Sequence, residues 1–260
     1  MNPQESAPCV RTAAPEAGIA EIVMSNPPVN ALPAAGWLEV AAQVTAAGQD
    51  PSVRAVVLRA EGRGFNAGVD IKELQAAAGF TALLEVSRGC FAAFKAIYEC
   101  AVPVIAAVHG YCLGGGIGLV GNSDVIIAAD DATFGLPEVD RGALGAATHL
   151  SRLVPQHKAR AMVYTSATAT AAELHRFGSV YSVVPADALR AAALAFAGQV
   201  AAKDPLVIRR AKESLNGIDP WDVNRSYRYE QGFTFELNLA GAGDRARDEF
   251  VAGPTRKATR

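Results

Sequence analysis

Hydrophobic positions divide the chain into short apolar runs and longer segments in which apolar residues recur every three or four positions. The short runs are rich in β-branched residues, which is typical of buried strands, and the longer segments have the spacing of helices. The predicted strands are residues 18–24, 55–60, 102–108, 124–129 and 180–184. The predicted helices are residues 34–47, 80–100, 115–122, 149–165, 171–177, 187–202, 205–215 and 221–239, followed by a shorter one.

Three regions follow from this pattern. Residues 1–15 are polar and contain proline, so we expect a disordered N-terminal segment. Residues 16–186 combine strands and helices in a repeated strand–strand–helix pattern, which predicts an α/β core. Residues 187–260 are predicted to be helical, and a helical end of this kind packs on a neighbour or covers a site.

Glycines gather directly after two of the predicted strands. Gly114, Gly115 and Gly116 remove every side chain where the helix of residues 115–122 begins, and a second glycine-rich segment spans residues 61–72. Free N–H groups at a helix start suit an oxygen that carries negative charge. Two such segments predict an oxyanion hole made of two backbone N–H groups. The alternative is that the glycines only let helices pack tightly on strands.

Three motifs, in this order and spacing, resemble the crotonase (enoyl-CoA hydratase/isomerase) superfamily, and the resemblance covers about residues 18–250. It implies a spiral of β-β-α units, an acyl-CoA thioester substrate, no permanently bound cofactor, and a C-terminal helical region that forms a homotrimer or a dimer of trimers. The motifs are Gly62-Arg-Gly-Phe-Asn-Ala-Gly-Val-Asp-Ile71, Gly110-Tyr-Cys-Leu-Gly-Gly-Gly116 and Phe134-Gly-Leu-Pro-Glu138.

The resemblance also implies where coenzyme A and the thioester oxygen lie. The oxyanion donors would be the backbone N–H groups of Val69 and Gly115. Asp70 has an alternative interpretation as a helix N-cap, and the segment after the two prolines at 27–28 is equally an ordinary turn. The implied CoA-binding residues are Val29, Asn30, Ala31, Ala67, Asp70 and Ile71.

One departure from the family pattern concerns the catalytic carboxyls. Hydratases of the family carry two glutamates, and here the first position is Gly118 while the second is Glu138. A hydratase uses one group to activate water and another to protonate carbon, whereas the isomerases use the Pro-Glu residue alone. We therefore predict Glu138 as general base, the alternative being a surface carboxylate. Asp140 is predicted to form a coupled carboxyl pair with Glu138, or else to pair with Arg141.

Other segments indicate which members of the family the chain resembles most. Dienoyl-CoA isomerases share a Glu-Val-Asp-Val-Gly-like segment but carry a further Asp where this chain has Ala146. Residues 60–72, 135–150 and 229–240 are similar to actinobacterial members of the family that open steroid ring D in cholesterol catabolism. This implies hydrolytic C–C cleavage of a bicyclic diketone carried as a CoA thioester, with Leu113 and Phe233 in the substrate pocket.

Other functions stay open beside this one. One is an enoyl-CoA isomerase or hydratase of fatty-acid oxidation, and another is a CoA-binding scaffold without catalysis. A third is a dinucleotide-binding oxidoreductase, although Gly64 is followed by three residues before Gly68 where that fingerprint has two. His109 is interpreted as a hydrogen-bonded histidine at a strand end, and His149 is a second candidate for chemistry.

The composition of the chain bears on its binding partners and on its location in the cell. At 260 residues, half of them hydrophobic, with a net charge of −2 and a pI near 6.1, the chain has no basic stripe apart from its last five residues, so no nucleic-acid partner is expected. The four cysteines lack the spacing of a metal site or a disulfide framework. No signal peptide or membrane-spanning run is predicted, so we expect a soluble cytoplasmic enzyme.

Overall fold

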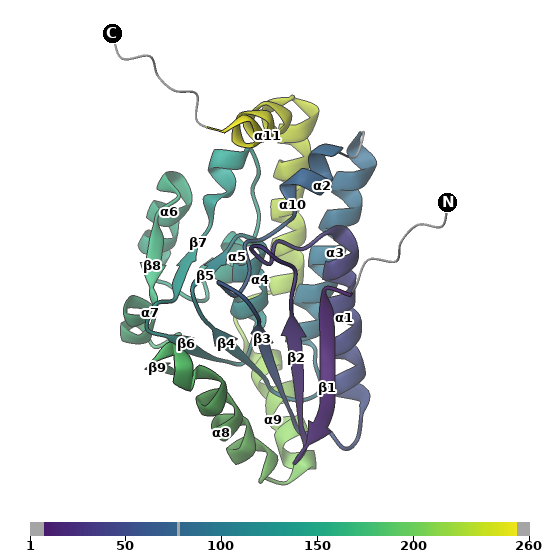
Figure 1. The fold of residues 1–260 in the computed structure, drawn as a ribbon, viewed down its shortest axis with the longest axis vertical. Coiled ribbons are helices and arrows are strands. Elements are labelled where there is room, and N and C mark those ends of the chain that lie inside the picture. Colours follow the sequence, from purple (N-terminus) through teal and green to yellow (C-terminus); the bar gives the residue numbers. More distant parts are fainter. Residues whose placement is uncertain (1–7, 77–78, 254–260) are drawn as a thin grey trace.

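A six-stranded sheet forms the centre of the computed structural model, which describes residues 8–76 and 79–253 (Figure 1). The strand order is β1-β2-β3-β4-β6-β9, and every neighbouring pair is parallel except β1 with β2. The strands are β1 (Val10–Glu16), β2 (Ile19–Met24), β3 (Ala55–Ala60), β4 (Val104–Val108), β6 (Val125–Ala129) and β9 (Ser182–Val184).

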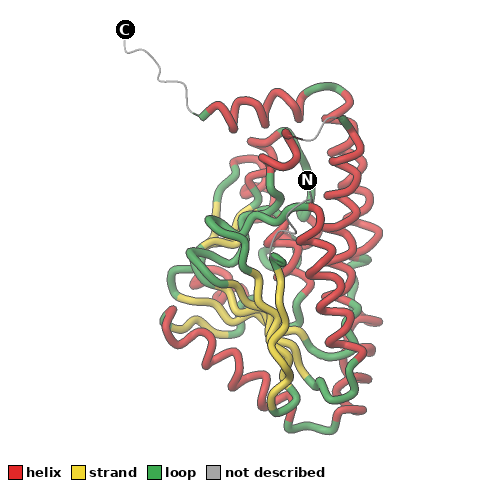
Figure 2. The backbone as a smooth tube through the Cα atoms, turned by 45° about the vertical axis from the view of Figure 1, so that its right-hand side comes forward, coloured by secondary structure: helices red, strands yellow, loops and turns green. Residues whose placement is uncertain are grey.

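Helices cover both faces of this sheet, as Figure 2 shows from the side. In β3, Val56 and Leu58 pack in the large core with α1 and α3, whereas Ala55 and Val57 face the smaller core under α8. Because side chains alternate along a strand, burial on both faces explains its continuous apolar run. The helices are α1 (Ala34–Gln49), α2 (Ile71–Ala76), α3 (Phe80–Tyr98), α4 (Gly115–Asn122), α5 (Ala147–Leu150), α6 (Gln156–Thr165), α7 (Ala171–Phe177), α8 (Leu189–Ala201), α9 (Pro205–Ile218), α10 (Val223–Leu239) and α11 (Ala242–Ala252).

Strand β1 corrects one prediction. Residues 10–16 form a strand, and residues 10–13 of it pair with β2 and bury Val10, so this part of the segment is not disordered. The strand is an antiparallel edge strand with an irregularity between Ala13 and Glu16, a position that tolerates the missing N–H of Pro15. Residues 1–7 of the predicted segment lie outside the described residues.

A second, three-stranded sheet brings the glycine motifs together. It consists of β5 (Tyr111–Leu113), β7 (Thr133–Gly135) and β8 (Thr168–Thr170), and it was not predicted. The backbone N–H of Gly114 donates to the Gly135 carbonyl at 3.0 Å, and the N–H of Leu113 donates to Asn66 at 2.8 Å. The three motifs of the sequence therefore meet at one end of the molecule.

The described part of residues 187–260 forms helices α8 to α11, as predicted, preceded by a short 3-10 helix, η2 (Ala186–Ala188). Helix α10 packs on α3 and α5, and α11 packs on α2 and on a second 3-10 helix, η1 (Pro137–Arg141). Among the described helices, no single one is long and apolar enough to cross a membrane. The pair Ala186–Ala201 and Pro205–Ile218 passes that test only jointly and is bent by 106°.

Candidate active site

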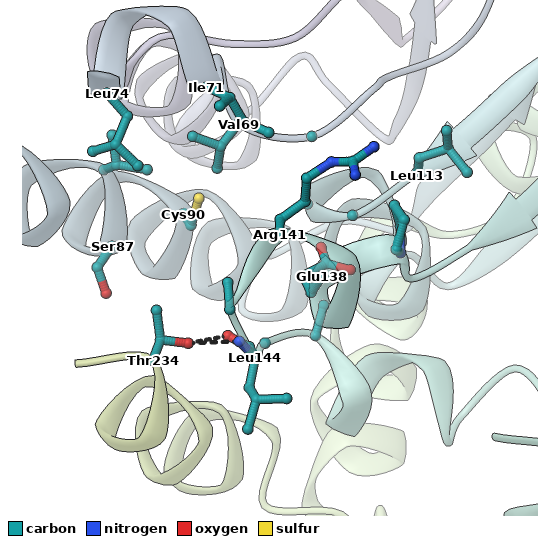
Figure 3. A pocket seen from close by; sticks show the side chains of 18 of the residues that line it. Val69, Ile71, Leu74, Ser87, Cys90, Leu113, Glu138, Arg141, Leu144 and Thr234 are labelled. Carbon is teal, nitrogen blue, oxygen red and sulfur yellow. Dashed lines mark hydrogen bonds between the residues drawn. The ribbon is translucent and has the colours of Figure 1, made fainter. Parts of the chain in front are cut away.

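A cavity of about 430 Å³ lies where the three motifs meet (Figure 3). Its wall is mostly apolar and comes from the 67–71 loop, α3, the 113–115 turn, η1 with the loop after it, and the C-terminal helices α10 and α11. Among the described residues that line it, Glu138 is the only carboxyl. A concave, mostly apolar pocket with a few polar groups is the usual form of a small-molecule site.

Two backbone N–H groups are free to bind an oxygen in this cavity. Val69 and Gly115 both line it, and across residues 8–76 and 79–253 neither of their N–H groups donates a hydrogen bond to the protein. The loops approach closely, since a Cβ built on Gly68 would lie 3.3 Å from the nitrogen of Gly115. Gly115 is also the first residue of α4, where the helix dipole is positive. Two N–H groups without a protein partner, on one cavity, are the donors that an oxyanion hole requires.

Glu138 projects from η1 toward the same turn. A Cβ on Gly114 would lie 2.7 Å from its Oε1, and Gly114 has a φ of 58°, so both space and conformation favour glycine there. Its Oε2 is buried and has no hydrogen-bond partner in the described part of the chain. Burial raises the pKa of Glu138 to about 8, assisted by the negative charge of Glu230. The surface-carboxylate interpretation is therefore wrong, and the carboxyl suits proton transfer near neutral pH.

Asp140 does not join this site. It is exposed and does not line the cavity, so the predicted pair with Glu138 is not formed. The physical reason is that η1 has about three residues per turn, which directs residues two apart to different sides. Arg141 and Asp140 form no ion pair either, because Nη1 of Arg141 contacts only the Asp140 carbonyl, at 3.5 Å.

The predicted CoA-binding residues divide into two groups. Val29, Ala67 and Ile71 line the cavity. The other three support the loops instead. Asn30 is buried and donates from Nδ2 to the carbonyls of Glu61 at 2.6 Å and Gly64 at 2.8 Å, and its Oδ1 accepts from the N–H of Asn26 at 2.7 Å.

Ala31 and Asp70 make similar local contacts. The Ala31 carbonyl accepts from Nδ2 of Asn26 at 2.6 Å. Oδ1 of Asp70 accepts from the N–H groups of Lys72 at 2.9 Å and Glu73 at 3.2 Å. These are N-cap contacts at the start of α2, so the capping interpretation of Asp70 is confirmed.

The face of α10 that meets the cavity differs from the predicted one. Leu113 lines the cavity as predicted, but Phe233 is 37% exposed and packs edge-on against Tyr229, with ring centroids 5.0 Å apart. Tyr227, Gln231 and Thr234 line the cavity instead. Their spacing of four and three residues marks one helix face, and position 233 falls on another.

Helix α10 also fixes the loop that follows η1. The hydroxyl of Thr234 accepts from the N–H of Leu144 at 2.9 Å and donates to the Leu144 carbonyl, as Figure 3 shows. Glu230 accepts from the N–H of Ala147 at 2.8 Å and from the N–H of Thr148 at 2.7 Å, so it holds the start of α5. Neither contact was predicted, because both join segments more than 80 residues apart.

The two histidines lie outside the cavity wall. His149 is buried between Phe94 and Tyr227, and its Nδ1 lies 3.0 Å from Nδ2 of Asn122. Burial lowers the pKa of His149 to about 3, so the ring is neutral at physiological pH. Nε2 of His109 lies 3.0 Å from the Gly62 carbonyl, which agrees with the predicted hydrogen-bonded role.

The cysteines contribute no metal site or disulfide in the described residues. All four are free, and no group of three or more potential metal ligands occurs between residues 8 and 76 or between 79 and 253. Cys90 lines the cavity from α3, and burial raises the pKa of its thiol, which keeps it protonated.

Comparison with known proteins gives three concordant findings. The family described as enoyl-CoA hydratase/isomerase matches residues 14–231. A (7aS)-7a-methyl-1,5-dioxo-2,3,5,6,7,7a-hexahydro-1H-indene-carboxyl-CoA hydrolase of Mycobacterium tuberculosis is 65% identical over 242 residues, covering 93% of this chain and 98% of the relative. The hydrolase of the same description from Rhodococcus jostii is 63% identical over 234 residues, covering 90% and 91%.

A solved structure agrees with these sequence relatives. The crystal structure of an enoyl-CoA hydratase/isomerase from Xanthobacter autotrophicus superimposes with a TM-score of 0.81 and 28% identity, covering 96% of this chain and all of that one. The agreement therefore extends over nearly the whole of both chains.

Proposed function

Because the chain belongs to the enoyl-CoA hydratase/isomerase family, we propose that it hydrolyses a carbon–carbon bond in a bicyclic diketone carried as a CoA thioester. The reaction is the opening of ring D in steroid degradation. One observation carries the proposal: a single buried carboxyl, Glu138, shares an apolar cavity with the two free N–H groups of Val69 and Gly115. The names of the two hydrolases at 65% and 63% identity support the choice of substrate.

Glu138 begins the reaction as a general base. In its ionised form it removes a proton from a water molecule, and the water oxygen bonds to the carbon of the ring ketone. The addition places negative charge on the former ketone oxygen. A positioned base contributes about 10²- to 10⁴-fold to such a step, and a carboxyl with a pKa near 8 is a much stronger base than an exposed one.

Cleavage follows when the water adduct collapses and the former ketone carbon becomes the carbon of a carboxylic acid. The bond between this carbon and the neighbouring ring carbon breaks, and its electron pair moves through the conjugated system to the thioester oxygen. The N–H groups of Val69 and Gly115 stabilise that oxyanion. In other enzymes, removal of one such donor costs about 3–4 kcal/mol. The proton held by Glu138 then passes to the ring carbon. One water is consumed, no redox change occurs, and the new acid ionises.

The rest of the cavity accommodates the two parts of the substrate. Val29, Ala67 and Ile71 lie on the side assigned to coenzyme A, and Leu113 with the inward face of α10 borders the rings. No cofactor other than the CoA of the substrate enters a step. A homotrimer or dimer of trimers stays a prediction from the family resemblance, and a cytoplasmic location stays a prediction from the sequence, in which no signal peptide was predicted.

The second candidate is an ordinary enoyl-CoA isomerase, which also uses one carboxyl. Hydration of an enoyl-CoA is less well supported because residue 118 is glycine, which leaves the cavity without a second carboxyl. Dinucleotide binding is not proposed again, since the glycine motifs belong to the family match. A scaffold without catalysis would not account for a buried carboxyl with a raised pKa.

The function is tested by comparing kcat/KM for three substrates: the bicyclic diketone CoA thioester, a straight-chain 2-enoyl-CoA and a straight-chain 3-enoyl-CoA. We expect the bicyclic compound to gain one water and a carboxylate, and the straight chains to be turned over at least about a hundredfold less efficiently. Turnover of a straight chain with comparable efficiency would contradict the proposal.

A further inference from the structure

Arg141 and Glu138 lie on the same face of η1. Both line the cavity, whereas Val139 and Asp140 between them are exposed. Because side chains three residues apart eclipse in a 3-10 helix, the arrangement follows directly from the helix type. Figure 3 shows both side chains at the cavity, with the guanidinium of Arg141 above Glu138 in this view and extending toward the side of Leu113. Burial raises the pKa of Glu138, and the positive charge of Arg141 offsets a small part of that rise.

The guanidinium of Arg141 has no carboxylate partner among the described residues. Its Nη1 has only the distant Asp140 carbonyl, and its Cζ lies 3.7 Å from the ring centroid of Phe250 in α11. Phe250 thus covers one face of the guanidinium and leaves its edge, which carries the N–H groups, free to donate.

A second arginine of the cavity makes the contrast clear. Arg247 also lines it, but its guanidinium bonds to Gln75 at 3.0 Å, to Asn238 at 2.6 Å and to Asp244 at 2.5 Å. Arg247 is therefore engaged in holding α11 in place. Apart from the contact of its Nη1 with the Asp140 carbonyl at 3.5 Å, Arg141 donates no hydrogen bond to the described protein.

We propose that Arg141 binds the carboxylate that ring opening creates. This inference rests on the proposed function. The substrate has a neutral ketone at the reacting carbon, and hydrolysis converts it into an anion. One oxygen of that anion comes from the water that Glu138 activates, so the carboxylate forms beside Glu138. Arg141 follows Glu138 by one turn of the 3-10 helix. A guanidinium matches a carboxylate with two parallel hydrogen bonds.

This contact favours the product side of the reaction. The substrate has a neutral ketone at the reacting carbon, whereas negative charge appears there when water adds and again when the new acid ionises, so Arg141 interacts more strongly with these states than with the substrate. It thereby distinguishes ring opening from double-bond migration, which creates no carboxylate. A phosphate of coenzyme A is the other anion that an arginine recognises, and the experiment separates the two sources.

The test measures dissociation constants by calorimetry for three probes: the ring-opened product, the same compound with a carboxamide in place of its carboxylate, and free coenzyme A. The variants are Arg141→Gln, which removes the charge, and Arg141→Lys, which keeps it without the planar fork. Arg210→Gln is the matched control, because Arg210 is exposed and pairs only with Glu213.

We expect Arg141→Gln to weaken binding of the carboxylate product about tenfold or more, while the carboxamide and coenzyme A change by less than about twofold. Arg141→Lys should fall between wild type and Arg141→Gln, and Arg210→Gln should match wild type. Retained coenzyme A binding shows on the same sample that the site is folded.

Two results would overturn the inference alone: an equal loss of affinity for coenzyme A, which would assign Arg141 to a phosphate, or an unchanged preference for the carboxylate. A wild-type enzyme that does not open the bicyclic substrate would overturn the proposed function, and with it this inference, before any variant is made. The two failures are therefore distinguishable.

Discussion

The ring of Phe94 occupies the space that a side chain on Gly118 would need: a Cβ built on Gly118 would lie 2.1 Å from Cζ of Phe94. Phe94 is buried, packs edge-on against Trp37 and Tyr227 and lines the cavity, so a side chain at position 118 would have to displace its ring. Position 118 is where hydratases of the family carry the first of their two glutamates. The packing of Phe94 in α3 against α4 therefore explains why position 118 is glycine and carries no carboxyl.

Gly118→Ala should destabilise the protein, although alanine ordinarily favours a helix. Overpacking a core costs about 1–3 kcal/mol, and the clash with Phe94 is severe. Gly198→Ala is the matched control, because a Cβ at Gly198 in α8 meets nothing within 4 Å, and it should stabilise by about 0.5–1 kcal/mol. Urea unfolding of both variants measures the difference. Equal effects of the two substitutions would contradict this account of position 118.

Glu138→Gln should lower kcat about 10²- to 10⁴-fold with little change in KM, since the amide fills the same space but cannot accept a proton from water. Asp140→Asn is the matched control from the same helix, and its exposed side chain should leave kcat within about twofold. Steady-state kinetics on the bicyclic substrate test both. A large loss in Asp140→Asn would restore the coupled pair that the structure does not form.

The pH dependence of kcat/KM should report the burial of Glu138. Only the ionised carboxylate can act as base, and its pKa is raised to about 8, so activity should rise with pH and level off above that value. Rates measured between about pH 5 and pH 10 locate the midpoint. A midpoint near the ordinary glutamate value of about 4.5 would mean that the carboxyl is solvated in the working enzyme.

The same raised pKa predicts a pH-dependent stability difference. From about pH 4.5 to about pH 8 the folded protein keeps the proton of Glu138 while the unfolded chain releases it, so this group lowers stability as pH rises through that window. Glu138→Gln removes the effect. Relative to wild type, the variant should therefore gain about 1–3 kcal/mol between pH 5 and pH 9, measured by denaturant unfolding. A constant difference between the two proteins would argue against a buried, protonated carboxyl.

The elements that were predicted well are those long enough to show a regular spacing of hydrophobic residues. Helix α4 and strand β3 have the predicted bounds, because several apolar residues in each define a face or a buried run. Strands β5, β7 and β8 have three residues each, too few for any period. Their pairing is nonetheless what joins the glycine turns to Glu138, so the assembly of the site was invisible in the local pattern.

The site itself was predictable where a motif marked it. The glycine turns were identified by their position after two predicted strands, and Glu138 was identified by the family resemblance. The orientation of single side chains was not, because it depends on which face a helix turns inward. Asp140 lies two residues from Glu138 and points outward, and Phe233 lies two residues from Gln231 and is partly exposed. Arg141 was named only as a partner for Asp140, and its place in the cavity follows from the 3-10 geometry of η1.

The central claim is that water activated by Glu138 attacks a ring ketone. Mass spectrometry of reactions run in water that carries the heavy oxygen isotope tests it, with the bicyclic diketone CoA thioester and a straight-chain 2-enoyl-CoA as substrates. We predict heavy oxygen in the new carboxylate of the bicyclic product and an unchanged straight chain. Labelled 3-hydroxyacyl-CoA, with the bicyclic compound left intact, would contradict the account and identify the protein as a hydratase despite Gly118.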